Sequence, residues 1–339
     1  MKHFRVLASL IALWLAAGAA LAQPAAVQQL QNSQQQQLQF PPSSLRVGTN
    51  APELYQGEND DIGAQHILRL GNTKEAAPRR RWLEAQVDSQ VFYTDNANFA
   101  YSGDRIGSFV FVNSVLAALS PDPFAVGDGR LSPILGFSSQ WYNYEDSQMK
   151  RLDFDAQTAF AGLRYQKGLW QYNAGLNFTR IVTQGSYTET YHEWLPNASI
   201  QRIIPFNNNL ALIVGDAVSY HFAEDSYPSN SLGIFYVRDD LNCRLDNTLF
   251  VTLNWQPVNN LIVQPFYRFQ YAFYPNDIST QNRRNDYLNS FGLNLIYSFN
   301  PHASVRTYFN YTTKTSDDTL TPSYDEVNGG LGVTLDLRF

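Results

Sequence analysis

The sequence of 339 residues is poor in cysteine, in methionine and in long apolar runs, and these shortages exclude whole classes of protein. Cys243 is the single cysteine, so the chain can form no intrachain disulfide and holds no CxxC redox or zinc motif. It also lacks a phosphate-binding loop, a calcium-loop spacing and a histidine-rich tract, and we therefore predict no cofactor and no bound metal. Beyond residue 22 there is no run of about eighteen apolar residues, which excludes membrane-spanning helices.

Charge is also scarce, whereas aromatic residues are abundant. Charged residues make up 16% of the chain, and the formal net charge of −6 falls by two, to −8, once Lys2 and Arg5 are excluded. An acidic chain is a poor partner for nucleic acid, so we predict no nucleic-acid binding. With 22 Phe, 20 Tyr and 6 Trp but a negative mean hydropathy, the composition is typical of a barrel with aromatic girdles, although a soluble globule can share this balance.

The first 22 residues have the pattern of a secretory signal peptide. Lys2 and Arg5 supply a positive segment, residues 6–15 are apolar, and Ala20-Leu21-Ala22 is a small-residue cleavage site. An uncleaved anchor is the alternative, but the apolar stretch is short for a membrane span. We therefore predict that residues 1–22 are removed.

The last nine residues, 331–339, alternate with a period of two. Leu331, Val333, Leu335, Leu337 and Phe339 fall on one face of an extended strand, and the polar residues between them fall on the other. This segment resembles the terminal strand of Gram-negative bacterial outer-membrane β-barrels. The resemblance implies that Leu335, Leu337 and Phe339 form an assembly signal read by the barrel assembly machinery, and that the chain lies in the outer membrane beside lipid and lipopolysaccharide.

Residues 23–79 separate the signal peptide from the alternating region. They are rich in glutamine and carry Pro24, Pro41 and Pro42, so they lack the apolar content to fold alone. We predict a flexible periplasmic linker. Within it residues 45–78 are irregular, and the sequence leaves open a plain linker, a plug or an element that contacts a periplasmic partner.

From residue 80 to residue 339 apolar and polar residues alternate as strands require. Trp170 and Leu176, for example, share one face of their segment, and Asn173 and Asn177 share the other. We predict an all-β, antiparallel, up-and-down transmembrane barrel of about twelve strands, each with about the ten residues that a tilted strand needs to cross a bilayer. The predicted segments are 82–93, 105–118, 131–144, 152–165, 169–184, 187–204, 210–222, 246–255, 261–274, 287–299, 304–313 and 324–339.

The connections between these segments alternate in length. If both termini are periplasmic, tight turns near Lys167, Asn208, Asn259 and His302 all fall on the periplasmic side, and most long polar connections fall on the other. Residues 120–130 are an exception, because they form a long connection on the predicted periplasmic side, where the other turns are tight. Pairing of the first segment with the twelfth is expected to remove both sheet edges, since unpaired backbone groups are costly in hydrocarbon.

Three residues disturb the pattern. Pro196 interrupts the sixth segment, and Pro265 suggests a bulge in the ninth because it removes a ladder donor. Arg164 shares a face with Phe154 and Phe160, so the sequence places it at a rim or after a bulge.

A soluble β-sandwich or soluble barrel, with its apolar face inward, has the same alternation. The terminal Phe339, the signal peptide, the strand lengths and the aromatic excess favour the membrane barrel. The polar face then lines a lumen with mixed charge, and a barrel of about twelve strands lies between filled and clearly open barrels. The pore-lining candidates are Glu84, Asp88, Asp153, Asp155, Asn173, Asn177, Arg268, Gln270, Asn294, Arg306, Asn310, Asp336 and Arg338.

Three functions are compatible with these features, and we rank first a passive channel for small polar solutes. The second is a structural or anchoring barrel that contacts a periplasmic partner through residues 23–79. The third is a lipid-active outer-membrane hydrolase, for which His221 and Ser219 are the only pair with suitable spacing. A histidine in the rim of the barrel is the simpler interpretation of His221, so we predict no catalytic residues.

Overall fold

The computed structural model describes residues 82–97, 105–150, 153–184, 187, 189–207, 209–225, 243–275, 283–300, 302–317 and 323–338. The predicted signal peptide, the predicted linker over residues 23–79 and Phe339 lie outside the described residues. Within these ranges the chain has no helix long and apolar enough to cross a membrane.

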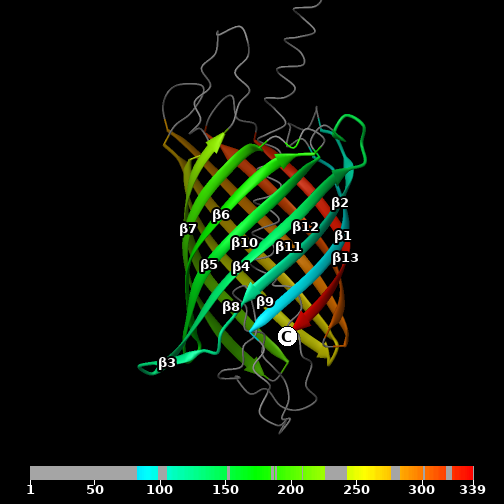
Figure 1. The fold of residues 1–339 in the computed structure, drawn as a ribbon. Helices are drawn as coiled ribbons and strands as arrows, with labels where there is room; N and C mark the ends of the chain where they lie inside the picture. Colours follow the sequence, from blue (N-terminus) through cyan, green and yellow to red (C-terminus); the bar gives the residue numbers. More distant parts are fainter. Residues whose placement is uncertain are drawn as a thin grey trace, which may run out of the picture.

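The described residues form thirteen strands in one antiparallel sheet, and twelve of these strands make a closed barrel (Figure 1). The twelve predicted segments are confirmed, with ends that differ by a few residues. The strands are β1 (Leu83–Thr94), β2 (Ser108–Leu119), β3 (Phe124–Val126), β4 (Gly129–Tyr144), β5 (Phe154–Lys167), β6 (Trp170–Thr183), β7 (Glu189–Asn207), β8 (Leu210–Asp225), β9 (Arg244–Val258), β10 (Leu261–Tyr274), β11 (Arg284–Asn300), β12 (Ala303–Ser316) and β13 (Tyr324–Arg338).

The barrel closes between its first and last strands, as predicted. β1 pairs with β13 along a continuous register from Glu84 opposite Arg338 to Thr94 opposite Asn328. On its other side β1 pairs with β2, and β2 pairs with β4. These ladders satisfy the backbone groups around the whole circumference, which is what a sheet in hydrocarbon requires.

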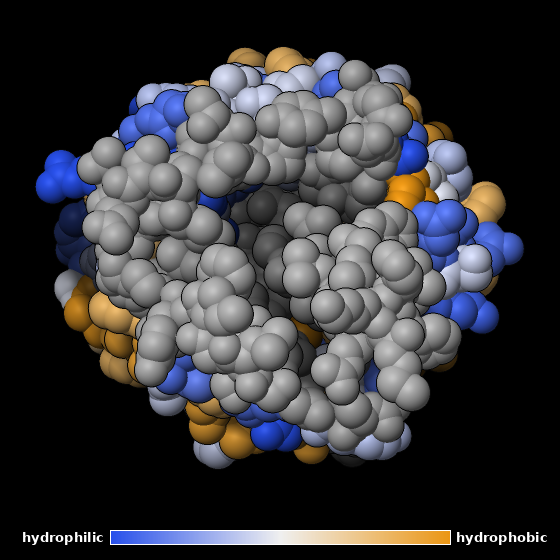
Figure 2. All heavy atoms as spheres, turned by 90° about the horizontal axis from the view of Figure 1, so that it is seen from above, coloured by the Kyte–Doolittle hydropathy of each residue, from blue (hydrophilic) through white to orange (hydrophobic). Residues whose placement is uncertain are grey.

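The polarity of the barrel is inverted relative to a soluble protein. On β1, Val87 is 48% exposed and points outward, whereas the adjacent Asp88 is 7% exposed and points inward. Trp170, Leu176 and Leu335 are exposed as well, as the sequence predicts for residues that face lipid. Seen down the barrel axis, hydrophobic residues appear on the outer circumference (Figure 2). Such a surface is stable in hydrocarbon rather than in water.

The two ends of the barrel differ in their connections. β5–β6, β7–β8, β9–β10 and β11–β12 are joined by only a few residues, and these turns lie at the end where β13 finishes (Figure 1). We call this the short-turn end. The longer connections lie at the opposite end, the long-loop end, so the predicted asymmetry is confirmed.

The long connection over residues 120–130 is explained by a small hairpin. β3 pairs only with the start of β4, from Phe124 opposite Leu131 to Val126 opposite Gly129, and projects from the short-turn end (Figure 1). Gly127 supplies the positive φ of 58° in its turn.

The three irregular residues are accommodated without breaking strands. β7 is continuous through Pro196, although its ladder to β8 skips from Trp194 to Asn197. The bulge expected at Pro265 is wrong in position, because the register between β9 and β10 shifts between Leu261 and Val263 instead.

The explanation offered for Arg164 is also only partly right. The register of β5 is unbroken with both neighbours, so no bulge precedes Arg164. Instead Phe154 and Phe160 point inward with Arg164, which lies near the short-turn rim. The expectation that these rings face lipid is therefore wrong.

Candidate functional site in the barrel interior

Most buried polar residues of the strands face the inner wall of the barrel. Alternation along each strand places every second side chain inside, and the interior shields Glu193, Asp286 and Glu326 completely. Buried charge is costly unless it is paired or hydrogen-bonded, so the partners of these groups indicate what the interior can do.

Most of the predicted pore-lining residues lie on this wall. Asp155 is an exception: it has the parity of the exposed Ala159 and Leu163, so it faces outward, and Gln184 Nε2 donates to it over 2.8 Å. Asp153 precedes β5 and accepts the backbone N–H of Tyr144 over 2.8 Å. The side chain of Arg338 is outside the described residues. The candidates on the inner wall are Glu84, Asp88, Asn173, Asn177, Arg268, Gln270, Asn294, Arg306, Asn310 and Asp336. Their contribution to a pore stays a prediction.

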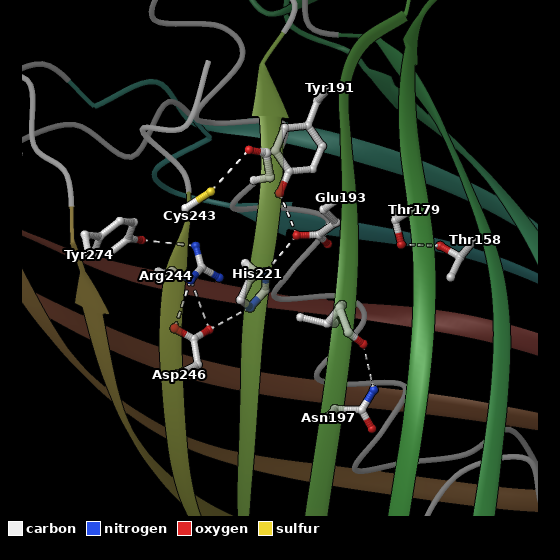
Figure 3. A network of polar contacts seen from close by, with 12 residues as sticks. Thr158, Thr179, Tyr191, Glu193, Asn197, His221, Cys243, Arg244, Asp246 and Tyr274 are labelled. Carbon is white, nitrogen blue, oxygen red and sulfur yellow. Dashed lines mark hydrogen bonds and ion pairs between the residues drawn. The ribbon is translucent and has the colours of Figure 1, made fainter. Parts of the chain in front are cut away.

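A ladder of charged groups crosses three strands near the long-loop end (Figure 3). His221 on β8 lies between two carboxylates, with Nδ1 2.7 Å from Glu193 Oε2 on β7 and Nε2 3.1 Å from Asp246 Oδ2 on β9. Arg244 donates through Nε to both oxygens of Asp246 over 2.9 and 3.0 Å. Tyr191 donates to Glu193 Oε2 over 2.6 Å. Two anions and two cations therefore neutralise one another.

The ladder continues across β10, β11 and β12. Arg244 Nη1 donates to the hydroxyl of Tyr274 over 3.1 Å, and the guanidinium of Arg284 lies 3.6 Å from the centre of the same ring. Asp286 then forms ion pairs with Arg284, whose Nε is 3.3 Å away, and with Lys314, whose Nζ is 2.9 Å away. The inner wall at this end thus carries two sets of paired charges, one on β7–β9 and one on β11–β12, with the neutral Tyr274 of β10 between Arg244 and Arg284.

A second polar group lies closer to the short-turn end. Asp88 on β1 accepts Arg306 Nη2 of β12 over 2.8 Å and the hydroxyl of Thr334 on β13 over 2.6 Å. Arg306 Nη2 also donates to Gln90 over 2.8 Å. These contacts cross the closure between the first and last strands, so they contribute to closing the barrel as well as lining it.

Near the long-loop end the opposite arc of the wall carries an apolar cluster that was not predicted from the sequence. Phe92, Val110, Val112, Tyr142, Phe154 and Ile181 point inward from β1, β2, β4, β5 and β6 and form one buried cluster. The rings of Tyr142 and Phe154 are stacked at 4.4 Å. The sequence does carry a sign of this cluster on β2, where residues 109–112 are all apolar, so that apolar side chains point inward as well as outward. This cluster occupies interior space near the long-loop end.

The geometry of His221 does not support a hydrolase. Carboxylates only accept hydrogen bonds, so both ring nitrogens of His221 act as donors to Glu193 and Asp246. Neither nitrogen is left to take a proton from Ser219, as a serine nucleophile would require. Across the described residues no group of three or more His, Cys, Asp or Glu is arranged to hold a metal ion.

The closed sheet, the apolar exterior and the charged interior together define the class of this protein. A sheet of this kind can be stable only where its outer face meets lipid. The chain is therefore a transmembrane β-barrel of the outer-membrane class, as its C-terminal pattern predicts.

Comparison with known proteins adds structural neighbours but no family. No family model matches the sequence, and no curated protein matches it either. An outer-membrane channel from Pseudomonas putida F1 is 10% identical, with 79% of this chain and 100% of that chain covered and a TM-score of 0.49. The outer-membrane channel DcaP of Acinetobacter baumannii is 10% identical, with 75% and 96% covered and a TM-score of 0.40. The KdgM porin, solved with disordered oligogalacturonate, is 10% identical, with 74% and 98% covered and a TM-score of 0.38. These identities and TM-scores are too low to transfer a function to this chain. The assignment to the transmembrane β-barrels rests on the apolar exterior and polar interior of the barrel itself.

Proposed function

We propose that this protein is a passive outer-membrane channel for small polar solutes, with the short-turn end and both termini in the periplasm. The observation that carries the proposal is the polar inner wall of a closed twelve-strand barrel, with buried polar groups from Glu84 near the short-turn end to Lys314 near the long-loop end. A barrel of this width has room for a solute path that an eight-strand barrel lacks.

The charges on the wall support small polar solutes rather than one simple ion. Arg244 is paired with Asp246, and Arg306 with Asp88, so the wall shows no ring of a single sign among the described residues. Mixed charge of this kind orients polar groups without strongly excluding either cations or anions. The apolar cluster around Tyr142 narrows the path from one side.

The same cluster favours a second candidate, the anchoring barrel. Tyr142 is fully shielded and Phe154 nearly so, which is the packing of a filled interior rather than a wide aqueous pore. In this alternative the barrel is a membrane anchor, and residues 23–79 contact a periplasmic partner.

Single-channel recording on the refolded protein distinguishes the two candidates. A channel is expected to give discrete conductance steps in a planar bilayer, and Tyr142→Ala is expected to enlarge them by widening the narrow side. The outward-facing Tyr172→Ala removes an equal side chain from the lipid face and is expected to leave conductance unchanged. Absence of steps in wild type and in Tyr142→Ala would exclude the channel and favour the anchor.

We also propose that the outer face of β13 is recognised by the barrel assembly machinery during insertion. Leu335 and Leu337 lie exposed on the outer face of β13, where the barrel assembly machinery and then lipid and lipopolysaccharide would meet them. Replacing both by Asn is expected to reduce insertion in cells while leaving the inner wall unchanged. Normal insertion of that variant would contradict the assembly role.

A further inference from the structure

Arg268 lies on the inner wall but lacks the carboxylate partner that Arg244, Arg284 and Arg306 have among the described residues. It lies near the middle of β10 and is only 3% exposed. Its Nη2 donates to Ser290 Oγ over 3.2 Å, and its Nε has no hydrogen-bond partner. Among the described residues no carboxylate oxygen comes within 4.0 Å of this guanidinium, whereas Arg244, Arg284 and Arg306 each have one.

A buried cation without a counter-ion is unfavourable, and proteins rarely keep one without a compensating partner. The surrounding ladder shows that this wall does supply carboxylates to its cations. The absence of a carboxylate partner for Arg268 among the described residues is therefore a specific feature of this position, and it points to an anion that these strands do not supply.

The neighbours of Arg268 suit an oxyanion. Ser290 lies directly opposite on β11 and accepts from the guanidinium, and its hydroxyl lies 3.1 Å from Thr312 Oγ1 on β12, so a second hydroxyl adjoins the first. On the other side Phe250 lies directly opposite on β9, with its ring turned over Gly215 of β8. The hydrogen bond within the hydroxyl pair uses one of its two hydrogens, so the other can be donated to a bound oxygen, and the burial of the guanidinium strengthens its attraction for an anion.

We propose that Arg268, with Ser290 and Thr312, is a binding station for the oxyanion group of a small solute, either a carboxylate or a phosphate, inside the barrel. The guanidinium presents a planar pair of N–H groups that match either group. The inference rests on the proposed channel and names its substrate class: small anionic solutes. Since the chain carries a net charge of −6, its overall charge would favour cations, and anion preference would come from this local site.

The first test measures binding and needs no conductance. Inorganic phosphate is titrated onto the refolded protein in detergent micelles, and the thermal midpoint and calorimetric affinity are recorded. Wild type is expected to be stabilised, and Arg268→Gln is expected to bind phosphate about tenfold more weakly, the order of loss for a charge-assisted hydrogen bond. Arg268→Lys is expected to recover part of the affinity because it restores the charge.

Arg202→Gln is the matched control. Arg202 lies on the outer face, 5.3 Å above the ring of Trp170, so this variant changes net charge equally without touching the interior. It is expected to bind phosphate as wild type does. An equal loss of phosphate affinity in both variants would show that only the net charge matters, and it would overturn the proposal. Unchanged phosphate binding in Arg268→Gln would overturn it as well.

The second test measures ion preference in a planar bilayer across a gradient of KCl. The ratio of chloride to potassium permeability is expected to fall several-fold in Arg268→Gln and to stay constant in Arg202→Gln. Conductance with an unchanged ratio would overturn the binding station while leaving the channel intact. No conductance, with phosphate binding that still depends on Arg268, would overturn the channel and keep the site.

Folding of the variants is itself informative. Removing a buried charge that has no partner is not expected to destabilise the barrel, so Arg268→Met should unfold at a denaturant concentration equal to or above that of wild type. A large loss of stability in Arg268→Met would show that the protein already compensates the guanidinium, and it would overturn the proposal without any ligand experiment.

Discussion

Phe266 and Gly292 lie directly opposite each other on β10 and β11, and the phenyl ring covers the glycine so closely that a Cβ there would overlap it. The same arrangement recurs on the inner wall in the cross-strand pairs Phe160–Gly136 and Phe250–Gly215. An aromatic ring laid over a glycine fills the space left by the missing side chain and shields its backbone. These pairs keep large rings against the wall.

Gly292→Ala is expected to destabilise the barrel by about 1–3 kcal/mol, the usual cost of adding a methyl group to a packed site. Denaturant unfolding in lipid vesicles, followed by tryptophan fluorescence, measures the change. Gly162→Ala is the control, because the nearest atom to a Cβ there, Ile134 Cγ2, is 3.3 Å away and needs to move by only a few tenths of an ångström. The double variant Phe266→Leu with Gly292→Ala should recover stability, and its failure to do so would contradict this explanation.

His221 is expected to stabilise the long-loop end of the barrel rather than to catalyse a reaction. His221→Gln removes the cation between Glu193 and Asp246 and should cost about 3–5 kcal/mol, as breaking a buried pair usually does. Ser219→Ala is expected to change stability by less than about 1 kcal/mol. The same unfolding measurement reports both. Loss of a phospholipid-hydrolysing activity on Ser219→Ala would contradict this prediction and revive the hydrolase.

Asp216 carries a carboxylate on the outer face of β8, between the exposed Val214 and Val218. Asn247 Nδ2 donates to it over 3.0 Å, which only partly compensates a charge facing lipid. Asp216→Asn removes the charge and is expected to raise stability in vesicles by about 1 kcal/mol. The buried Asp246→Asn should act in the opposite direction, because it leaves Arg244 without its carboxylate and His221 with Glu193 alone. A loss of stability in Asp216→Asn would show that a cation or another protein meets this face.

Adjacent cysteines on β1 test the inverted polarity directly. With Cys243 replaced by Ala and a maleimide nitroxide attached before insertion, the label at Val87→Cys should be accessible to oxygen dissolved in the lipid and the label at Asp88→Cys should not, since neighbouring side chains of a strand point to opposite faces. Accessibility is measured by electron paramagnetic resonance power saturation on protein in vesicles. Equal accessibility at both positions, or the reverse pattern, would contradict the transmembrane barrel.

The strand count and the outward residues could be predicted from sequence because both depend on local signals. Alternation with a period of two marks each strand, and Asn, Pro and Gly mark the turns, as between residues 256 and 261. Where one face is clearly apolar, as on β6 and β13, the side that meets lipid follows at once. On β5 the pattern gave the wrong face, because Phe154 and Phe160 are apolar residues that pack inside the barrel.

The sequence by itself determined a chain of alternating strands that must close and must turn its apolar face to lipid, because period and turn chemistry are encoded residue by residue. Only the tertiary structure decided which interior groups meet. Asp88 and Arg306 are 218 residues apart, and they pair because the register of β1 and β13 closes the barrel between them. The same closure places Arg268 beside the hydroxyl of Ser290, while no carboxylate of the described residues comes within 4.0 Å of it. Contacts between distant strands depend on register and strand tilt, and no local pattern records either.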